Sequence, residues 1–284
     1  MNGFINLYKP RGISSAQCLN KVKKILDYKC GHMGTLDPLA CGVLPVAVGQ
    51  ATRLFDLMLD KQKVYIAEFT FGYETDTLDL EGETILSGGR VPTAEEIEKI
   101  LPSLVGEIDQ IPPAYSAKCV DGKKSYQLAR AGKTVELAPK KVQIYSIKML
   151  KKQSQAPAYR FEITCGGGTY IRSICRDMAY ALNTYATMSA LERIQSGYFT
   201  KQNSVTVEQL ESCENPCDLL IASDETLSFE KVVLTKAQAE RILNGIYDDY
   251  HLPDGKYRAY CEQEFWGVAN VQNKKLVIKP YVRG

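Results

Sequence analysis

Apolar side chains alternate strictly between residues 63 and 71, and this pattern constrains the fold more than any other part of the sequence. Tyr65, Ala67, Phe69 and Phe71 occupy every second position, so they share one face of an extended chain. Elsewhere apolar residues follow the helical period, as in the segment from about residue 170 to 182. Strand-like and helix-like segments are interspersed, which predicts a mixed α/β fold.

The length of the chain and one acidic stretch indicate two domains. With 284 residues the chain exceeds the usual single-domain range of about 100–200 residues. Between Asn203 and Glu230 it carries seven acidic residues and no basic one, which is typical of a connector. A helix beginning near Thr235 and three short strands follow. We predict one domain over residues 1–229 and a small β-rich domain over residues 230–284.

The composition argues against membrane, secreted and metal-dependent classes. The chain is 45% apolar and 24% charged, and no apolar run approaches the roughly 18 residues of a membrane span. Its amino-terminal residues lack the apolar core of a secretory signal, so we expect a cytoplasmic protein without membrane association. Nine cysteines occur without a Cys-x-x-Cys pair, which favours reduced thiols over disulfides or a zinc site.

Motifs for nucleotide cofactors and for serine hydrolysis are missing from the sequence. Cys165-Gly166-Gly167-Gly168 follows a predicted strand, but it lacks the G-x-G-x-x-G spacing of a dinucleotide site, and no Walker lysine motif occurs. These glycines predict a tight turn that another backbone or a ribose phosphate can approach. With two histidines and no G-x-S-x-G elbow, a serine hydrolase is poorly supported.

Positive charge is concentrated in one segment, although the formal net charge is only +2. From Lys118 to Lys141 there are seven basic residues and two acidic ones. Both a polyanion-binding face and an ordinary solvated surface fit such a run. The surrounding sequence is rich in Pro, Lys and Gly, and we predict an arm near residues 113–139 that grips the substrate.

The run from Gly31 to Pro45 contains the residues best suited to chemistry. It reads G-H-M-G-T-L-D-P-L-A-C-G-V-L-P. An isolated Asp-Pro pair is typical of a turn, but the whole run closely resembles the catalytic motif G-H-x-G-x-L-D-P-x-A-x-G-V-L-P of the bacterial tRNA pseudouridine synthase B (TruB) family. Further segments resemble motifs of that family in the same order, namely Lys9-Pro10, Lys63-Val64-Tyr65, residues 72–79 (G-x-x-T-x-T-x-D) and residues 168–173 (G-T-Y-I-R-S).

The resemblance covers the chain from its first strand to about Phe199, and the tail after residue 230 is similar to a small PUA-type RNA-binding domain. It implies an α+β pseudouridine synthase fold with a largely antiparallel central sheet flanked by helices, followed by a β-barrel-like domain. It also implies that the protein isomerises uridine 55 in the T loop of tRNA to pseudouridine. We therefore expect the T arm of tRNA as partner, no obligate protein partner, a monomer, and no metal, nucleotide or organic cofactor.

The resemblance assigns roles to residues around the reacting base. Asp37 becomes the nucleophile, which attacks either the ribose C1′ or C6 of the base, and the sequence does not choose between them. Arg172 pairs with Asp37, although a lone arginine near a helix start is ordinarily a surface residue. Tyr65 stacks on the base and is a candidate for removing the C5 proton, while Tyr170 and Leu191 contact the substrate.

Other residues are expected to contact the rest of the RNA. His32 resembles a residue that fills or braces the T loop, with proton transfer as the alternative. The candidates for phosphate contacts are Lys9, Lys123, Lys124 and Arg130. The chain departs from the family pattern at three positions, where Met33 replaces Thr, Cys119 replaces Lys and Glu192 replaces Arg, and we expect these changes to remove RNA contacts.

Three other functions are alternatives to a tRNA pseudouridine synthase. An RNA-binding or RNA-folding protein could retain the scaffold without catalysis, and a guide-RNA-dependent relative could act on ribosomal RNA. The third alternative is an enzyme that depends on a metal or a nucleotide.

Overall fold

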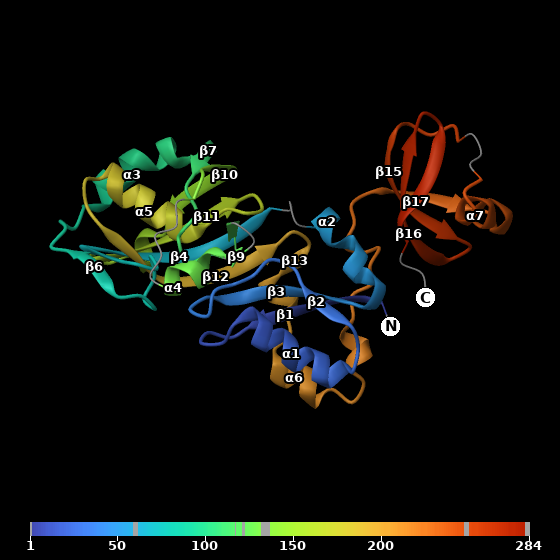
Figure 1. Ribbon diagram of the computed structural model, residues 1–284, viewed down its shortest axis with the longest axis horizontal. Helices are drawn as coiled ribbons and strands as arrows, with labels where there is room; N and C mark the ends of the chain where they lie inside the picture. The colour runs from blue at the N-terminus through green and yellow to red at the C-terminus, as the bar shows by residue number, and fades with distance from the viewer. Residues whose placement is uncertain are drawn as a thin grey trace.

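The computed structural model describes residues 2–58, 62–116, 118–120, 123–131, 137–246 and 250–281. Figure 1 shows a large sheet with helices packed on it, and a smaller unit at the carboxy-terminal end that stands to one side. None of the helices in these ranges has the length and apolar character needed to cross a membrane. The mixed α+β class predicted from the sequence is confirmed.

A nine-stranded sheet forms the centre of the larger part of the molecule. Its strands are β1 (Gly3–Lys9), β2 (Cys30–His32), β3 (Cys41–Val48), β4 (Lys63–Phe71), β7 (Gly106–Gln110), β10 (Lys140–Met149), β11 (Ala158–Cys165), β12 (Ala186–Ser196) and β13 (Phe199–Thr200). The order is β1-β3-β12-β4-β11-β10-β7, with β2 beside β3 and β13 beside β12. Only β12 and β3 pair in parallel, so the sheet is largely antiparallel.

The larger part of the molecule also contains helices, several of which pack on this sheet. They are α1 (Ser15–Leu26), α2 (Phe55–Met58), α3 (Ala94–Ile100), α4 (Ser125–Arg130), α5 (Ile171–Ala181) and α6 (Val207–Ser212), together with the 3₁₀ helices η1 (Gly49–Leu54), η2 (Leu101–Leu104), η3 (Lys151–Gln153), η4 (Lys201–Asn203) and η5 (Pro216–Leu219). Helix α5 packs against β12 and β4, and α1 packs with α6 below β1 and β3 in Figure 1.

The predicted alternation in β4 is present, because odd-numbered residues from Lys63 to Phe71 are buried and the residues between them are half-buried. Phe69 and Phe161 stack at a centroid distance of 5.0 Å on the covered face. Each large apolar side chain buried there contributes about 1.5–3 kcal/mol. Tyr65 occupies one of the buried positions, so it belongs to this covered face.

Capping residues fix the ends of α1. Ser14 accepts the Gln17 N–H through its side chain, and the Gln17 side chain accepts the Ser14 N–H in return, which completes a capping box. At the other end Asp27 adopts a left-handed conformation and its N–H donates to the Lys23 carbonyl. The start of the helix is thereby placed beside the loop that contains Asp37.

The carboxy-terminal unit contains α7 (Lys236–Leu243) and a separate four-stranded sheet. Its strands are β14 (Glu230–Leu234), β15 (Gly255–Cys261), β16 (Glu264–Gln272) and β17 (Lys275–Tyr281). The predicted helix and three strands are confirmed, and β14, which pairs in parallel with β15, was not anticipated. The described strands form an open sheet rather than the closed barrel that the resemblance implied.

An apolar cluster joins this unit to the larger sheet. Phe265 and Val268 of β16 contribute to it from one side, and Phe4, Ala47 and Leu54 contribute from the other. Two polar contacts reinforce the junction, since the Arg258 Nε donates to the Phe229 carbonyl (2.8 Å) and the Tyr260 hydroxyl donates to Asp224 (2.5 Å).

Several short elements of the structure were not predicted from the sequence. The polar loop after β4 contains a hairpin of β5 (Tyr73–Thr75) and β6 (Thr84–Ser87), and the acidic connector contains α6. The segment from Gly49 to Met58 is a 3₁₀ helix followed by one turn of α-helix. The predicted arm is described in part, as α4 and the short strands β8 (Cys119–Val120) and β9 (Lys123–Lys124).

Candidate active site

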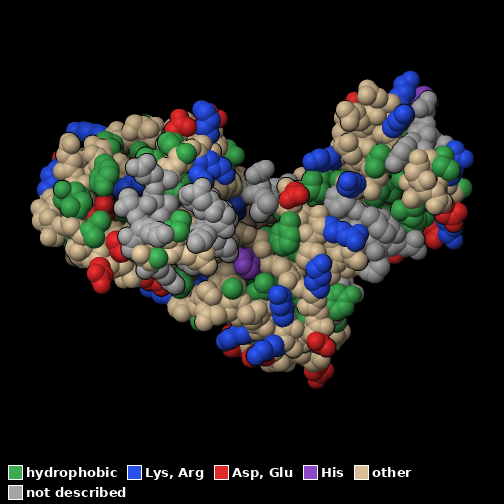
Figure 2. Space-filling view, in the orientation of Figure 1, with side chains coloured by type: hydrophobic (Ala, Val, Ile, Leu, Met, Phe, Trp, Pro, Cys, Tyr) green, Lys and Arg blue, Asp and Glu red, His purple; other side chains and the backbone are tan. Residues whose placement is uncertain are grey.

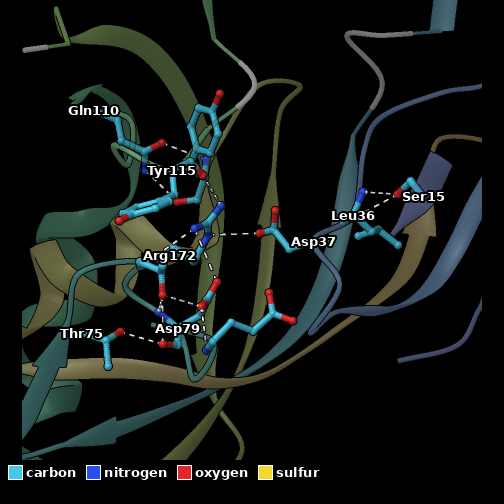
Figure 3. Close-up of polar contacts among 11 residues, drawn as sticks. Ser15, Leu36, Asp37, Thr75, Asp79, Gln110, Tyr115 and Arg172 are labelled. Carbon is cyan, nitrogen blue, oxygen red and sulfur yellow. Dashed lines mark hydrogen bonds and ion pairs between the residues drawn. The ribbon is translucent and has the colours of Figure 1, made fainter. Parts of the chain in front are cut away.

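Asp37 lies in the loop between β2 and β3, and neighbouring backbone groups hold this loop in place. Ser15 donates through Oγ to the Leu36 carbonyl (2.9 Å) and accepts the Leu36 N–H (2.8 Å), as Figure 3 shows. The Gly12 N–H donates to the Pro38 carbonyl (2.8 Å). Because the residues on both sides of Asp37 are fixed, its carboxylate is directed toward α5.

Lys9 also helps to hold this loop in place. The prediction that it contacts an RNA phosphate is wrong. Its side chain is wholly buried, and its ammonium donates to the carbonyls of Pro10 (2.9 Å) and Ile13 (2.6 Å), with Pro38 at 3.4 Å. An ammonium enclosed by carbonyls cannot also reach an RNA phosphate. The sequence did not reveal this because Lys9 follows an apolar strand, where solvent exposure is the usual state of lysine.

Arg172, in the first turn of α5, is the partner of Asp37. Its Nε lies 3.0 Å from Asp37 Oδ2, and only 6% of its side chain is exposed. Nη1 donates to the Thr77 carbonyl (2.8 Å) and Nη2 donates to the Tyr115 carbonyl (3.0 Å). A guanidinium with several fixed acceptors has one orientation, so Asp37 meets a preorganised cation.

A second carboxylate, Asp79, completes this network and was not singled out from the sequence. Its Oδ2 lies 3.4 Å from Arg172 Nη1, and its side chain is 3% exposed. Its other oxygen accepts the Thr77 hydroxyl (2.7 Å) and the Glu81 N–H (3.0 Å). The sequence did mark this position, because Asp79 is the last residue of the G-x-x-T-x-T-x-D segment. A buried carboxylate requires a cation or hydrogen-bond donors, and Arg172, Thr77 and Glu81 supply them here.

Opposing effects act on the pKa of Asp37. Burial raises the pKa of the Asp37 carboxyl above its usual value, and the nearby Asp79 adds to this rise. Arg172 acts in the opposite direction, because its positive charge and hydrogen bond stabilise the carboxylate. The Asp37 side chain remains 34% exposed, so the ionised oxygen is accessible to a bound ligand.

Tyr65 and Arg193 stand side by side on neighbouring strands. They are direct partners in the antiparallel pairing of β4 with β12, and 6% of Tyr65 and 1% of Arg193 is exposed. Burial raises the pKa of the Tyr65 phenol, and the Arg193 guanidinium partly offsets this rise. Arg193 was also not singled out from the sequence.

One cavity of about 800 Å³ brings together several predicted residues from distant parts of the chain. Asp37, Tyr65, Tyr170, Arg172 and Leu191 all line it. Its size lies in the range of about 300–1,000 Å³ that is typical of ligand sites. In the described residues, no group of three or more His, Cys, Asp or Glu side chains is arranged to hold a metal ion.

His32 does not line the described cavity. His32 is half-buried at the end of β2, and burial followed by the charge of Arg193 lowers the pKa of its imidazole. Its Nδ1 has no hydrogen-bond partner among the described residues. The side chains of Lys123, Lys124 and Arg130, and that of Cys119, lie outside the described part of the structure, so their predicted contacts are not tested.

The structure describes the surroundings of two residues that depart from the family pattern. Met33 is 5% exposed and packs in the apolar cluster that includes Phe199. Glu192 accepts the Tyr8 hydroxyl (2.7 Å) and forms an ion pair with Lys201 (2.6 Å). Its negative charge is therefore neutralised within the protein.

Comparison with known proteins identifies relatives along the whole chain. Residues 21–171 match the TruB family pseudouridylate synthase (N terminal domain), and residues 172–221 match the tRNA pseudouridylate synthase B C-terminal domain. The tRNA pseudouridine synthase B of Clostridium novyi (strain NT) is 41% identical, over 98% of this chain and 99% of the relative. That of Alkaliphilus oremlandii (strain OhILAs) is 39% identical, over 96% and 94%.

Solved structures of more distant proteins share the fold. An H/ACA RNP bound to a substrate RNA containing 2′-deoxyuridine includes a chain with a TM-score of 0.73 and 22% identity, which covers 99% of this chain and 85% of that chain. A Cbf5-Nop10-Gar1 complex gives a TM-score of 0.73 at 23% identity, with 99% and 84% covered. The fold agrees with the sequence match, and the chain belongs to the TruB family of pseudouridylate synthases.

Proposed function

We propose that this protein is a tRNA pseudouridine synthase that isomerises uridine 55 in the T loop to pseudouridine. The observation that carries the proposal is the contact between Asp37 and Arg172, at 3.0 Å, in a cavity that Tyr65 and Leu191 also line. A nucleophilic carboxylate, a cation that keeps it ionised and an aromatic ring occupy one site. This set fits a reaction on a single everted base.

The reaction requires neither an oxidant nor net addition of water. The bond between N1 and C1′ breaks, the base rotates, and a bond forms between C5 and C1′, while C5 loses a proton and N1 gains one. Asp37 supplies the carboxylate that forms the covalent intermediate, at C1′ or at C6. Arg172 favours the ionised form of Asp37, and Asp79 restrains Arg172 from its other side.

The other side chains that line the cavity hold the base during its rotation. Stacking on Tyr65 is worth roughly 1–3 kcal/mol, which offsets the few kcal/mol needed to unstack the nucleotide. Leu191 excludes water from the detached base. The Tyr170 backbone is fixed by Gln110, whose amide donates to the Tyr170 carbonyl (3.1 Å) and accepts its N–H (2.8 Å).

Basic side chains on another part of the surface support RNA as the substrate. Figure 2 shows Lys and Arg side chains gathered over α1 and toward the carboxy-terminal unit. Lys23, Lys29 and Arg53 line a hollow of about 650 Å³ in this region. Cations in such positions neutralise phosphates and make binding dependent on salt.

The proposal extends to the organisation of the protein. It includes a catalytic domain over residues 1–229, with an RNA-gripping arm near 113–139, and a PUA-like RNA-binding domain over residues 230–284. It also includes action as a monomer in the cytoplasm, without an obligate protein partner. Light scattering of the free protein and of its complex with tRNA tests the stoichiometry.

Release of tritium from tRNA labelled at C5 of uridine tests the reaction. The purified chain alone should release one equivalent from unmodified tRNA and from a T-arm minihelix. Asp37→Asn should release none, because a neutral amide is not a nucleophile, yet should bind the RNA within a few-fold of wild type. Asp177→Asn is the matched control, since Asp177 pairs with Arg176 on α5 and does not line the cavity.

The competing functions correspond to other results of the same assay. Wild-type protein that binds tRNA without releasing tritium would support a non-catalytic RNA-binding protein. Activity that appears only after a guide RNA is added would support the guide-dependent alternative. Loss of activity on dialysis, with recovery on adding a metal or a nucleotide, would support the third.

A further inference from the structure

Arg193 contacts both the strand that carries Tyr65 and the loop that carries Asp37. Its side chain is 1% exposed, and it is one of the largest fully buried side chains in the described residues. Its Nε donates to the Val43 carbonyl of β3 (2.7 Å), and its Nη2 donates to the Gly34 carbonyl (2.9 Å). Gly34 precedes Asp37 by three residues in the same loop.

The strand pairing places the same residue against Tyr65. Arg193 is the cross-strand partner of Tyr65 on one side and of Gly42 on the other. Directly opposed residues of an antiparallel pair project to the same face of the sheet, with Cβ atoms about 4.5–5.5 Å apart. The guanidinium therefore lies between the Tyr65 ring and the loop of Asp37, and both Arg193 and Tyr65 line the cavity.

A buried arginine is costly unless its donors are used. Removing a guanidinium from water costs several kcal/mol, and apolar side chains could fill the same volume at a lower cost. Here its donors are directed at the backbone of β3, at the backbone of the Asp37 loop and toward the Tyr65 phenol, where its charge offsets part of the rise in pKa that burial causes. Each of these groups either contacts or positions a residue of the proposed reaction.

We propose that Arg193 is a positioning residue for the isomerisation, which sets the Tyr65 side chain and the Asp37 loop at their working separation. The inference rests on the proposed function, since it concerns the same site. Misplacing a reacting group by about 1 Å can cost on the order of 100-fold in rate. The loss should appear in the chemical step rather than in RNA binding.

Arg193→Lys is the primary test, because lysine keeps the charge but cannot reach all three partners. Under single-turnover conditions with saturating enzyme, the rate constant of tritium release should fall roughly 30- to 100-fold. The dissociation constant for tRNA should stay within about threefold. Arg193→Gln, measured at a temperature where circular dichroism shows it folded, should lose more. Arg160→Lys is the matched control, because Arg160 pairs with Glu68 on the outer face of the same sheet.

A double-mutant cycle with Tyr65→Phe separates positioning from a purely structural role. If Arg193 acts through the Tyr65 hydroxyl, the fold loss from Arg193→Lys should be at least threefold smaller in the Tyr65→Phe background. The inference would be overturned if the fold loss of the double variant equalled the product of the two single losses. It would also be overturned if a folded Arg193→Lys protein had the wild-type rate. Those results leave the proposed function standing, whereas an inactive wild type refutes the function itself.

Discussion

At the scale of single residues, Asp37 lies between opposing charges that set the pH at which it can act. Its pKa is raised by burial and by Asp79, and it is lowered by Arg172. Only the ionised form attacks, so the single-turnover rate should fall with decreasing pH, and the fall should begin at a higher pH than for an ordinary aspartate.

Asp79→Asn should move this acid limb to lower pH. The substitution removes a like charge from the neighbourhood of Asp37, which makes ionisation of Asp37 easier. The plateau rate should also fall, roughly tenfold, because Arg172 loses one of the groups that orient it. Asp76→Asn is the control, since Asp76 lines the same cavity but accepts from Tyr115 instead of Arg172. An acid limb that does not move in Asp79→Asn would contradict this electrostatic account.

The sequence predicted several residues that gather at the cavity, but it did not predict the surroundings of every candidate residue. Asp37, Arg172 and Tyr65 were recognisable because each stands in a distinctive local motif. The burial of Lys9 and Met33 depends on packing between segments far apart in the chain, which local sequence does not report. For the same reason Arg193 could not be assigned, since its partners come from β3, β4 and the Asp37 loop.

At the scale of elements, the parallel pairing of β3 with β12 depends on a glycine at position 42. Gly42 has φ of 109°, and a Cβ atom there would stand 2.2 Å from the Arg193 carbonyl oxygen and 2.8 Å from the Arg193 nitrogen. The parallel register between the two strands consists of the pairs Glu192 with Cys41 and Arg193 with Gly42. Any side chain at position 42 therefore separates the strand that carries Arg193 from the strand that follows the Asp37 loop.

Gly42→Ala should destabilise the protein by about 3–5 kcal/mol, measured by urea unfolding. The effect combines backbone strain with the steric clash. Gly12→Ala is the matched control, because Gly12 also has a positive φ of 89° but no atom within 4 Å of the added Cβ. It should cost only the strain, about 1–2 kcal/mol. Equal losses in the two variants would show that the close approach at Gly42 is unimportant.

The strands and helices with strong periodicity were predictable, whereas the elements inside polar segments were not. Alternation identified β4, and the helix predicted to begin near Thr235 is present and opens with a capping box. Helix α6 also has a capping box, at Thr206, but the surrounding acidic residues concealed it. Its buried residues, Val207 and Leu210, obtain their cover from distant segments, and a single segment cannot show that cover.

At the scale of the whole molecule, the carboxy-terminal unit has a core of its own but shares a second cluster with the larger part. Trp266 and Leu276 belong to its own core, whereas Val268 belongs to the shared cluster with Phe4 and Leu54. Two cores joined by one cluster should unfold together while the cluster is intact. They should separate when it is broken.

Val268→Asp is expected to uncouple the two parts. Val268 is 1% exposed, and an unpaired carboxylate there costs several kcal/mol. Trp266 is the only tryptophan of the chain, so its fluorescence follows the carboxy-terminal unit alone. In wild type, loss of fluorescence and loss of tritium release from a T-arm minihelix should occur at the same urea concentration. In the variant the fluorescence transition should move to lower urea while the activity transition stays nearly in place.

Val233→Asp provides the control for this experiment, because Val233 lies on β14 of the same unit and is 60% exposed. A carboxylate there stays hydrated, so both transitions should remain coincident. If Val268→Asp shifted both transitions equally, the cluster would be part of a single cooperative core rather than a junction. Separation of the two transitions would instead mean that the catalytic sheet is stable without support from the carboxy-terminal unit. That unit would then be free to contribute to RNA binding rather than to folding.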